Sequence, residues 1–154
     1  MEALERLQRW FLRELHCNEE YAFVHFNFAP PVLRRDIGLL GLLHKRVLGL
    51  AHPAYDRLFP FHHEYWNGHS KQIYSHTAEC TFQWVMFNRS IFGLASIYNK
   101  LPQWLVDTDT IKDFQRTLTR IAKDRCQGGD DAWKLSFNAH YHYTHRFHIG
   151  EEER

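Results

Sequence analysis

One stretch of the sequence constrains the fold more than any other. Residues 31–50 read PVLRRDIGLLGLLHKRVLGL, and they lie between the Pro30-Pro31 pair and the His52-Pro53 break. Proline fits the first turn of a helix and interrupts a helix interior, so these residues predict one central helix over 32–49. Its apolar side chains fall in one broad sector: Leu33, Ile37, Leu39, Leu40, Leu43, Val47 and Leu48. A sector of that width predicts contact with several other elements.

Two polar side chains fall inside this apolar sector. Asp36 and His44 share the helix face that Leu33 and Leu40 define. An ionised group that is buried without a partner is costly, so the sequence predicts a hydrogen-bond partner for each of the two. Asp36 is therefore predicted to be a structural anchor and not a catalytic carboxylate.

A second helix is predicted over residues 110–126. Thr110, with Asp113 three residues later, resembles a capping box, and the Gly128-Gly129 pair ends the segment. The apolar stripe of this helix consists of Ile111, Phe114, Leu118 and Ile121. A basic strip on another face consists of Lys112, Arg116, Arg120 and Lys123. The strip fits two interpretations, an ordinary solvated face or a surface that binds phosphates.

The first fifteen residues predict a short amphipathic helix. Apolar residues recur at helical spacing among charged side chains, at Leu4, Leu7, Phe11 and Leu15. This apolar face needs a partner surface. A secretory signal would need an uncharged apolar block instead, so we expect an intracellular protein that is not secreted. Residues 21–28 fit either an extended segment or a loose helix.

The other segments are expected to form shorter helices and aromatic-rich loops. Residues 54–58 predict a short helix, followed by a loop and a short strand near residues 72–74. Residues 81–101 predict one or two helices that end before Pro102, because the residue before a proline is driven out of the helical conformation. The His-rich stretch 129–154 is expected to be a poorly ordered tail.

Composition and charge exclude several classes of protein. The chain has 154 residues, 44% of them hydrophobic, which suits one globular domain. Its 19 Lys and Arg nearly balance 18 Asp and Glu, so any basic function must be local. Cys17, Cys80 and Cys126 form a poor disulfide framework. The longest apolar stretch, Ile37–Leu43, is far shorter than the roughly 20 residues that span a bilayer, so we expect no membrane partner.

The twelve histidines invite a metal site, but their spacing does not support one. Zinc ligands usually come as pairs on two separate arms. The densest group lies in one terminal stretch, at His140, His142, His145 and His148, and the pair of His76 and Cys80 is one that chance would supply. A phosphate-binding glycine loop and a nucleophile with a paired base are also lacking. The sequence therefore predicts no metal, no cofactor and no catalytic residue.

Four segments, in order along the chain, carry a resemblance to a known family. They read LERLQRWFLREL at residues 4–15, RRDIGLLGLLHKRVLG at 34–49, GHSKQI at 68–73 and FNRSIFGLASIYNKLPQWLVDTDTIKDFQRTL at 87–118. Over about residues 4–126 the chain resembles the region downstream of the polymerase domain in reverse transcriptases of non-LTR, LINE-type retrotransposons. The most specific feature is an aromatic-Asn-x-Leu-Pro turn at residues 98–102, followed by a helix of Phe-x-x-x-Leu type.

This resemblance implies a scaffold and not a reaction centre. The polymerase chemistry of that family depends on an aromatic-Ala-Asp-Asp box in an upstream region, which this sequence does not contain, so we expect no enzymatic activity. The expected structural residues are Tyr98, Asn99, Leu101, Pro102, Phe114 and Leu118. The implied activity is help in holding RNA or DNA, and the candidate phosphate-binding residues are Arg34, Arg35, Lys45, Arg46, Lys112, Arg116, Arg120 and Lys123.

Together these observations predict an all-α single domain of four to five helices over residues 1–128, followed by the tail. The expected function is that of a non-catalytic fragment or derivative of a retrotransposon reverse transcriptase, an accessory region that assists nucleic-acid binding. The alternative is a helical protein-interaction module without a nucleic-acid role, which an excess of aromatic residues around 55–66 and 82–92 favours. The oligomeric state stays open.

Overall fold

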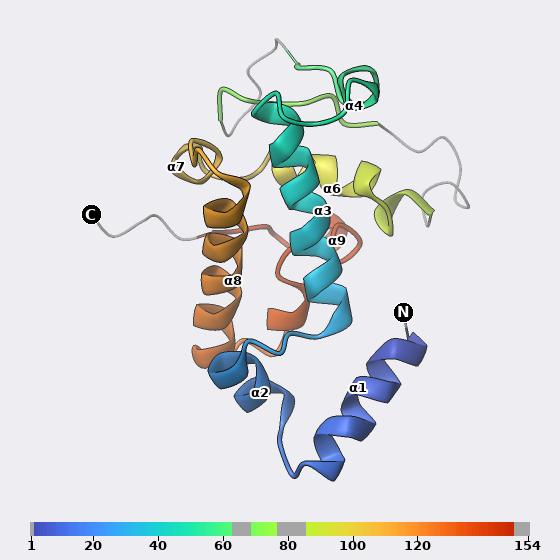
Figure 1. The fold of residues 1–154 in the computed structure, drawn as a ribbon, viewed down its shortest axis with the longest axis vertical. Helices are drawn as coiled ribbons and strands as arrows, with labels where there is room; N and C mark the ends of the chain where they lie inside the picture. The colour runs from blue at the N-terminus through green and yellow to red at the C-terminus, as the bar shows by residue number, and fades with distance from the viewer. Residues whose placement is uncertain (1, 63–68, 77–85, 150–154) are drawn as a thin grey trace.

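The computed structural model describes residues 2–62, 69–76 and 86–149, and this part of the chain is mostly helical. Its elements are α1 (Glu2–Glu14), α2 (Glu19–Phe26), α3 (Pro31–Val47), α4 (Ala54–Leu58), α6 (Ile91–Tyr98), α7 (Gln103–Val106), α8 (Ile111–Gln127), the 3₁₀ turn η1 (Trp133–Leu135) and α9 (Tyr141–Thr144) (Figure 1). The predicted all-α class is confirmed. The prediction of four to five helices was too low, because it did not count one-turn elements such as α7 and α9.

Local chemistry explains where the long helices begin. Pro31 occupies the first turn of α3, where a missing N–H costs nothing. Thr110 caps α8: its hydroxyl oxygen accepts a hydrogen bond from the Asp113 N–H at 3.1 Å. The side chain of Asn18 caps α2 in the same way, accepting from the Tyr21 N–H at 2.7 Å. Residues 21–28, which fitted two structures, are therefore mostly helical.

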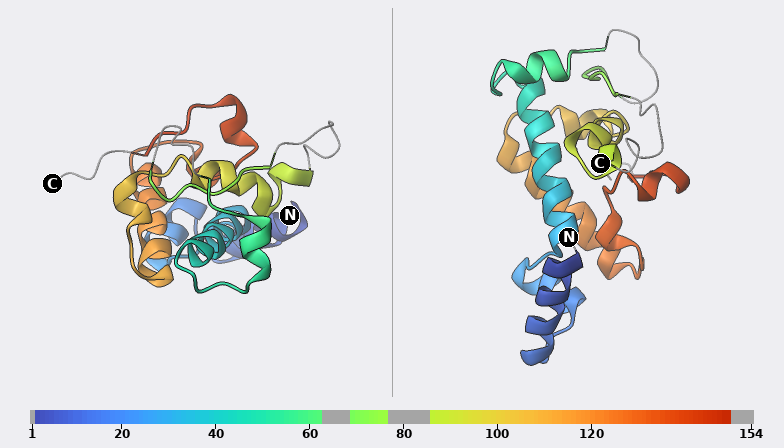
Figure 2. Two further views of the ribbon diagram at one scale, coloured as in Figure 1. Left: turned by 90° about the horizontal axis from the view of Figure 1, so that it is seen from above. Right: turned by 90° about the vertical axis from the view of Figure 1, so that its right-hand side faces the viewer.

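Helix α3 runs through the middle of the molecule and packs against α8 and α6, as Figures 1 and 2 show. Its Leu33, Leu40 and Leu43 side chains are fully buried. Phe114 and Leu118 of α8 are buried in the same core. The apolar sector of α3 thus contacts several elements, as its width predicts.

The hinge between α6 and α8 turns at Leu101 and Pro102. Pro102 precedes the first residue of α7, and Leu101 is fully buried in the core. The segment before the hinge ends in Tyr98, whose ring lies 6.1 Å from the ring of Phe114. The hinge therefore returns the chain so that α8 packs on α3.

The segment at residues 69–76 lies on this hinge. The strand predicted near residues 72–74 is reduced to an isolated antiparallel bridge between Phe61 and Ile73. Ile73 is fully buried, and the N–H of His62 donates to the carbonyl of Gln72 at 2.9 Å. Residues 81–85 of the predicted helical stretch lie outside the described residues, and α6 begins after the Ser90 cap.

The chain after residue 129 differs from the poorly ordered tail that its His-rich composition predicts. Trp133 stacks on Phe23 of α2, with the ring centroids 5.0 Å apart and an interplanar angle of 5°. Phe137 and Ala139 are also buried in the main core. That prediction was wrong for residues 133–142, because it was made from the histidine content and gave no weight to the apolar side chains that lie between the polar ones. Residues 150–154 lie outside the described residues.

Helix α1 extends from one end of the molecule, away from the α3 and α8 pair (Figures 1 and 2). Among residues 3–14 of this helix, only Gln8 and Leu12 are buried. The four apolar side chains that predicted an amphipathic helix remain largely exposed: Leu4 57%, Leu7 59%, Phe11 46% and Leu15 59%. Among the helices described, none is both long enough and apolar enough to cross a membrane.

Candidate nucleic-acid interface

The basic strip of α8 lines a shallow hollow between α8 and the end of α2. The hollow has a volume of about 610 Å³, and Lys112, Arg116, Arg120 and Lys123 all line it. Residues four positions apart on a helix are displaced by about 6 Å along its axis, so the first three of these side chains form a regular row. The structure thus places the four α8 candidates on one surface.

The fourth cation, Lys123, lies beyond the row and is fixed to α2. The ammonium group of Lys123 donates a hydrogen bond to the Val24 carbonyl at 3.0 Å, and its nitrogen lies 5.6 Å from the centre of the Phe23 ring. Both contacts hold this side chain against the α2 wall of the hollow. Lys123 therefore supplies positive charge from a defined position.

The three side chains of the row are more exposed to solvent than Lys123. Lys112 and Arg120 are exposed, and Arg116 forms an exposed ion pair with Asp113 at 2.6 Å. Asp124 also lines the hollow. Four cations against two carboxylates, Asp124 and the Asp113 that pairs with Arg116, leave this surface positive although the whole chain is almost neutral. A surface of this kind attracts phosphate groups without reading a base sequence.

The four candidates on α3 do not join this surface, because none of them lines the hollow. Arg46 is buried: its Nε donates to the Phe59 carbonyl at 3.1 Å and pairs with Asp56 at 2.9 Å, and the guanidinium covers the Phe61 ring at 4.4 Å. A side chain held by three partners is not free to bind phosphate. Lys45 is half-buried.

Arg34 and Arg35 also have partners within the chain. Arg35 pairs with the buried carboxylate of Asp36 at 2.7 Å. Arg34 donates to Oε1 of Gln8 at 3.2 Å and lies over the Phe28 ring at 5.6 Å. The contacts of Arg34 tie α3 to α1 and to the segment before α3, and Arg35 is the charge partner of the buried Asp36, so structural roles account for both arginines.

Sequence reasoning missed a buried polar network at the hinge. His44 is fully buried and stacks on Phe114 with the ring centroids 4.1 Å apart. Its Nε2 lies 2.8 Å from the Thr108 carbonyl, which only accepts, so Nε2 carries the proton and donates. Nδ1 must then accept the hydroxyl proton of Tyr98 at 3.0 Å. The signal for this network was the polar residue in the apolar sector, and its predicted partner is present.

A second buried histidine supports the other side of Tyr98. Nε2 of His69 donates to the Tyr98 carbonyl at 2.9 Å, and Nδ1 accepts from the Lys71 N–H at 3.0 Å. Burial lowers the pKa of His44 and of His69 from the ordinary histidine value, so both imidazoles are neutral at pH 7. Burial raises the pKa of Tyr98, which keeps its hydroxyl protonated. None of these three rings lines the hollow beside α8.

The same hinge holds the segment at residues 69–76 through Asn99. Its Oδ1 accepts from the Ile73 N–H at 3.0 Å, and its Nδ2 donates to the Ile73 carbonyl at 2.7 Å. Lys71 adds a hydrogen bond to the Val106 carbonyl at 3.1 Å and an ion pair with Asp107 at 3.0 Å. The hinge therefore holds a segment that is distant in sequence through hydrogen bonds to its backbone.

Asp36 has the partners that its place in the apolar sector predicts. Its carboxylate pairs with Arg35 and accepts from Nδ2 of Asn138 at 3.3 Å. Burial raises the pKa of Asp36 to about 6, although the charge of Arg35 opposes that shift. These contacts link α3 to the segment between η1 and α9, which is an anchoring role.

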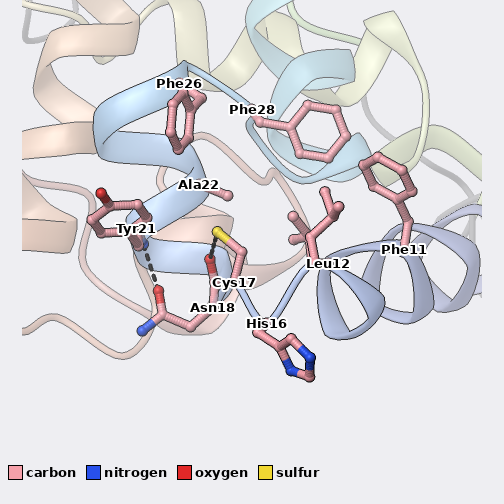
Figure 3. Close-up of a pocket in the computed structure, with 10 residues that line it drawn as sticks. Phe11, Leu12, His16, Cys17, Asn18, Tyr21, Ala22, Phe26 and Phe28 are labelled. Carbon is pink, nitrogen blue, oxygen red and sulfur yellow. Dashed lines mark hydrogen bonds between the residues drawn. The ribbon is translucent and has the colours of Figure 1, made fainter.

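A second surface of interest is apolar and lies between α1 and α2. Figure 3 shows Phe11 and Leu12 on the α1 side, Tyr21, Ala22 and Phe26 on α2, and Phe28 between the two helices. This hollow has a volume of about 620 Å³. A neighbouring hollow of about 390 Å³ is lined by Leu4, Leu7, Trp10 and Arg34 and shares Phe11 and Phe28 with the first. The predicted amphipathic stripe of α1 was the signal for this surface.

The described residues bring no three His, Cys, Asp or Glu side chains close enough to hold a metal ion. Cys80, the partner of His76 in the weak spacing pair, lies outside the described residues. Comparisons of the chain with family models, curated proteins and solved structures gave no match.

Proposed function

We propose that this chain is a non-catalytic accessory module, of the kind found downstream of the polymerase in LINE-type reverse transcriptases, and that its α8 face holds nucleic-acid backbone. One observation carries the proposal: the four cationic side chains of α8 line a single hollow. The retroelement origin rests on the four ordered sequence segments, and an intracellular location belongs to the same proposal.

The chemistry of the hollow favours phosphate as the ligand. The cations recur at about 6 Å along α8, and Lys123 is held in place by α2, so a phosphodiester chain along the helix would meet several charges in succession. The exposed pair of Arg116 with Asp113 is weak in water and can be exchanged for a phosphate contact. The proposed binding reads charge and not sequence.

A salt titration tests the proposal. The purified chain is titrated against fluorescent mixed-sequence RNA and duplex DNA of equal length at several salt concentrations. Four phosphate contacts give a slope of log K against log salt of about −3 to −4. In the double variant Lys112→Gln/Arg120→Gln, we expect affinity to fall for both nucleic acids. We also expect the slope to become less negative by about 2, one unit for each lost contact.

The matched control removes two positive charges elsewhere. Arg9 and Arg13 are exposed on α1, so Arg9→Gln/Arg13→Gln changes net charge by the same amount without touching α8. We expect this variant to bind with almost the original slope. Equal losses in the two double variants, or binding that does not respond to salt, would overturn the proposal. The RNA and DNA arms show which backbone is preferred.

A second candidate function is a protein-interaction module, and the apolar surface along α1 and α2 favours it. The aromatic segments that first pointed to this function lie partly outside the described residues, whereas Leu7 and Trp10 are 59% and 52% exposed. If these side chains serve docking, Leu7→Glu and Trp10→Glu leave the free energy of unfolding of the dilute chain within about 0.5 kcal/mol. A large loss of stability would assign them to the core instead.

A further inference from the structure

We propose that a second copy of this chain covers the apolar surface of α1 and α2, through an antiparallel pairing of the two α1 helices about a two-fold axis. This inference deepens the second candidate function and is independent of nucleic-acid binding. It rests on the extent of the surface, on the arrangement of charge along α1, and on the way α1 stands out from the molecule.

The surface is continuous and large. The two hollows adjoin at Phe11 and Phe28. Together they are lined by the large apolar residues that are exposed on α1, on α2 and in the turn between them: Leu4, Leu7, Trp10, Phe11, Leu15, Tyr21 and Phe26. At about half exposure, and with about 150–250 Å² for a whole aromatic side chain, they present roughly 700 Å². A typical monomer exposes no larger patch than roughly 300–600 Å². A stable interface buries roughly 800 Å² on each partner, so this surface has the size that a symmetric dimer needs.

The shape of α1 allows it to pair with itself. Gln8 and Leu12 attach one stripe of the helix to the molecule, and the exposed apolar arc lies beside that stripe. The helix has 13 residues and is therefore about 20 Å long, with Leu7 and Phe11 near its middle. A two-fold axis near these two residues lays the apolar arc of one copy on that of the other.

The charges on α1 select the antiparallel direction. At 100° per residue Glu14 falls within the apolar arc, near the end of the helix, and Arg6 falls at its edge in the first half. In an antiparallel pair each Glu14 lies near Arg6 of the other copy. In a parallel pair Glu14 would face Glu14, and like charges repel. The pattern is thus complementary to its own two-fold image.

A lipid surface is the main competing occupant of an amphipathic helix. Helices that bind anionic membranes carry an excess of Lys and Arg on the polar face. Residues 2–14 contain three glutamates and three arginines, so α1 has no net charge to attract such a membrane. The self-pairing accounts for the balanced charge, whereas membrane binding does not.

The test is the molar mass of the full chain by light scattering at concentrations up to about 100 μM, a range that detects dimers of moderate affinity. We expect twice the mass of the 18.5 kDa chain at the upper end. Leu7→Glu and Trp10→Glu are expected to give monomers with unchanged circular dichroism. Leu50→Glu is the matched control, because Leu50 is 60% exposed and lies outside the surface, and it is expected to remain a dimer.

A charge-swap series tests the direction of pairing. Glu14→Arg and Arg6→Glu each place like charges together twice in the dimer, so each is expected to raise the Kd roughly fivefold or more, and the double variant is expected to restore it. A monomer at every concentration, equal dissociation of the Leu50→Glu control, or failure of the double variant to restore the dimer would overturn the inference. Sedimentation of the unmodified chain with phosphatidylserine vesicles would also overturn it, in favour of a membrane, if Leu7→Glu and Trp10→Glu abolish that sedimentation.

These outcomes separate the self-pairing from the function on which it rests. If the wild-type chain is a monomer but Leu7→Glu and Trp10→Glu keep the stability of the dilute chain, the surface is not part of the core and only the second copy is rejected as its occupant. If the same variants unfold the dilute chain, the interaction module itself is rejected.

Discussion

The Tyr98 hydroxyl donates a hydrogen bond to Nδ1 of His44 over 3.0 Å, linking the end of α6 to the last turn of α3 across 54 positions of sequence. Both side chains are fully buried. The bond fixes the imidazole with its other nitrogen toward the Thr108 carbonyl, 2.8 Å away. One buried side chain thus joins α3, α6 and the segment before α8.

Tyr98→Phe is expected to lower the free energy of unfolding by about 1–3 kcal/mol, because it leaves the buried Nδ1 acceptor of His44 without a donor. The change removes one oxygen and keeps the ring that packs on Phe114. Urea unfolding followed by circular dichroism measures the loss. Most of it should come from the unpaired nitrogen and not from altered packing.

A double-mutant cycle with His44→Leu separates these two causes. Once the imidazole is gone, Tyr98→Phe should cost much less than in the original chain, since no acceptor is left unpaired. Equal costs in the two backgrounds would contradict the assigned hydrogen bond.

Stability is expected to fall as the pH decreases below about 6.5, the value at which unfolded histidines begin to bind protons. Burial lowers the pKa of His44, His69 and His142 in the folded chain. The unfolded chain then binds protons that the folded chain does not. The free energy of unfolding therefore decreases as the pH falls, until the pH reaches the lowered pKa values of the folded chain. Urea midpoints measured between pH 8 and about 4.5 test this dependence.

Asp36 should act in the opposite direction. Its pKa is raised from 3.8 to about 6, so between these values the folded carboxyl binds a proton that the unfolded one does not. This group therefore favours the folded state as the pH falls through that window. Asp36→Asn removes the opposing contribution, and we expect the variant to lose stability more steeply between about pH 6 and pH 4. A shallower slope in the variant would contradict the raised pKa.

The long helices and their starts could be predicted because the signals are local. Thr110 and Asp113 lie within one turn of each other, and Pro31 sets the start of α3 without reference to the rest of the chain. The need for partners at Asp36 and His44 followed from helical periodicity and the cost of burying a polar group. Those parts of the fold depend on neighbours in sequence.

The identity of the partners could not be predicted, because it depends on contacts between distant segments. Arg46 was a candidate phosphate ligand by residue type, but the Phe59 carbonyl and the Phe61 ring enclose it. Trp133 lies in a stretch that composition marks as a tail, yet it stacks on Phe23 more than a hundred residues earlier. Helical spacing alone predicted the basic strip of α8. That α2 lies against this strip could not be predicted, because it depends on contacts between distant segments.

Two glycines offer a matched pair of substitutions. A Cβ at Gly93 of α6 would lie 2.6 Å from the Phe87 carbonyl oxygen and 2.7 Å from the Asn88 Cα, whereas a Cβ at Gly38 of α3 meets nothing within 4 Å. We expect Gly93→Ala to destabilise the fold by about 1–3 kcal/mol, because backbone must move. Gly38→Ala should stabilise it by about 0.5–1 kcal/mol through helix propensity. Thermal unfolding compares the two, and equal shifts would contradict the close approach at Gly93.

Asn99→Ala is expected to destabilise the chain by at least about 1–3 kcal/mol, because both the N–H and the carbonyl of buried Ile73 lose their partner. Asn99→Asp keeps an acceptor for the N–H but cannot donate to the carbonyl, so it should be destabilising as well.

The control for this prediction is Gln103→Ala, which removes two exposed hydrogen bonds, one accepted from the Ser70 N–H and one donated to the Asp107 carboxylate, and should cost less than about 1 kcal/mol. Hydrogen exchange at the Ile73 amide gives the specific measurement. If Asn99 holds the segment at residues 69–76 on the hinge, exchange at Ile73 accelerates in Asn99→Ala more than in Gln103→Ala, beyond what the change in global stability explains. Equal acceleration in the two variants would show that the hinge does not hold this segment through Asn99.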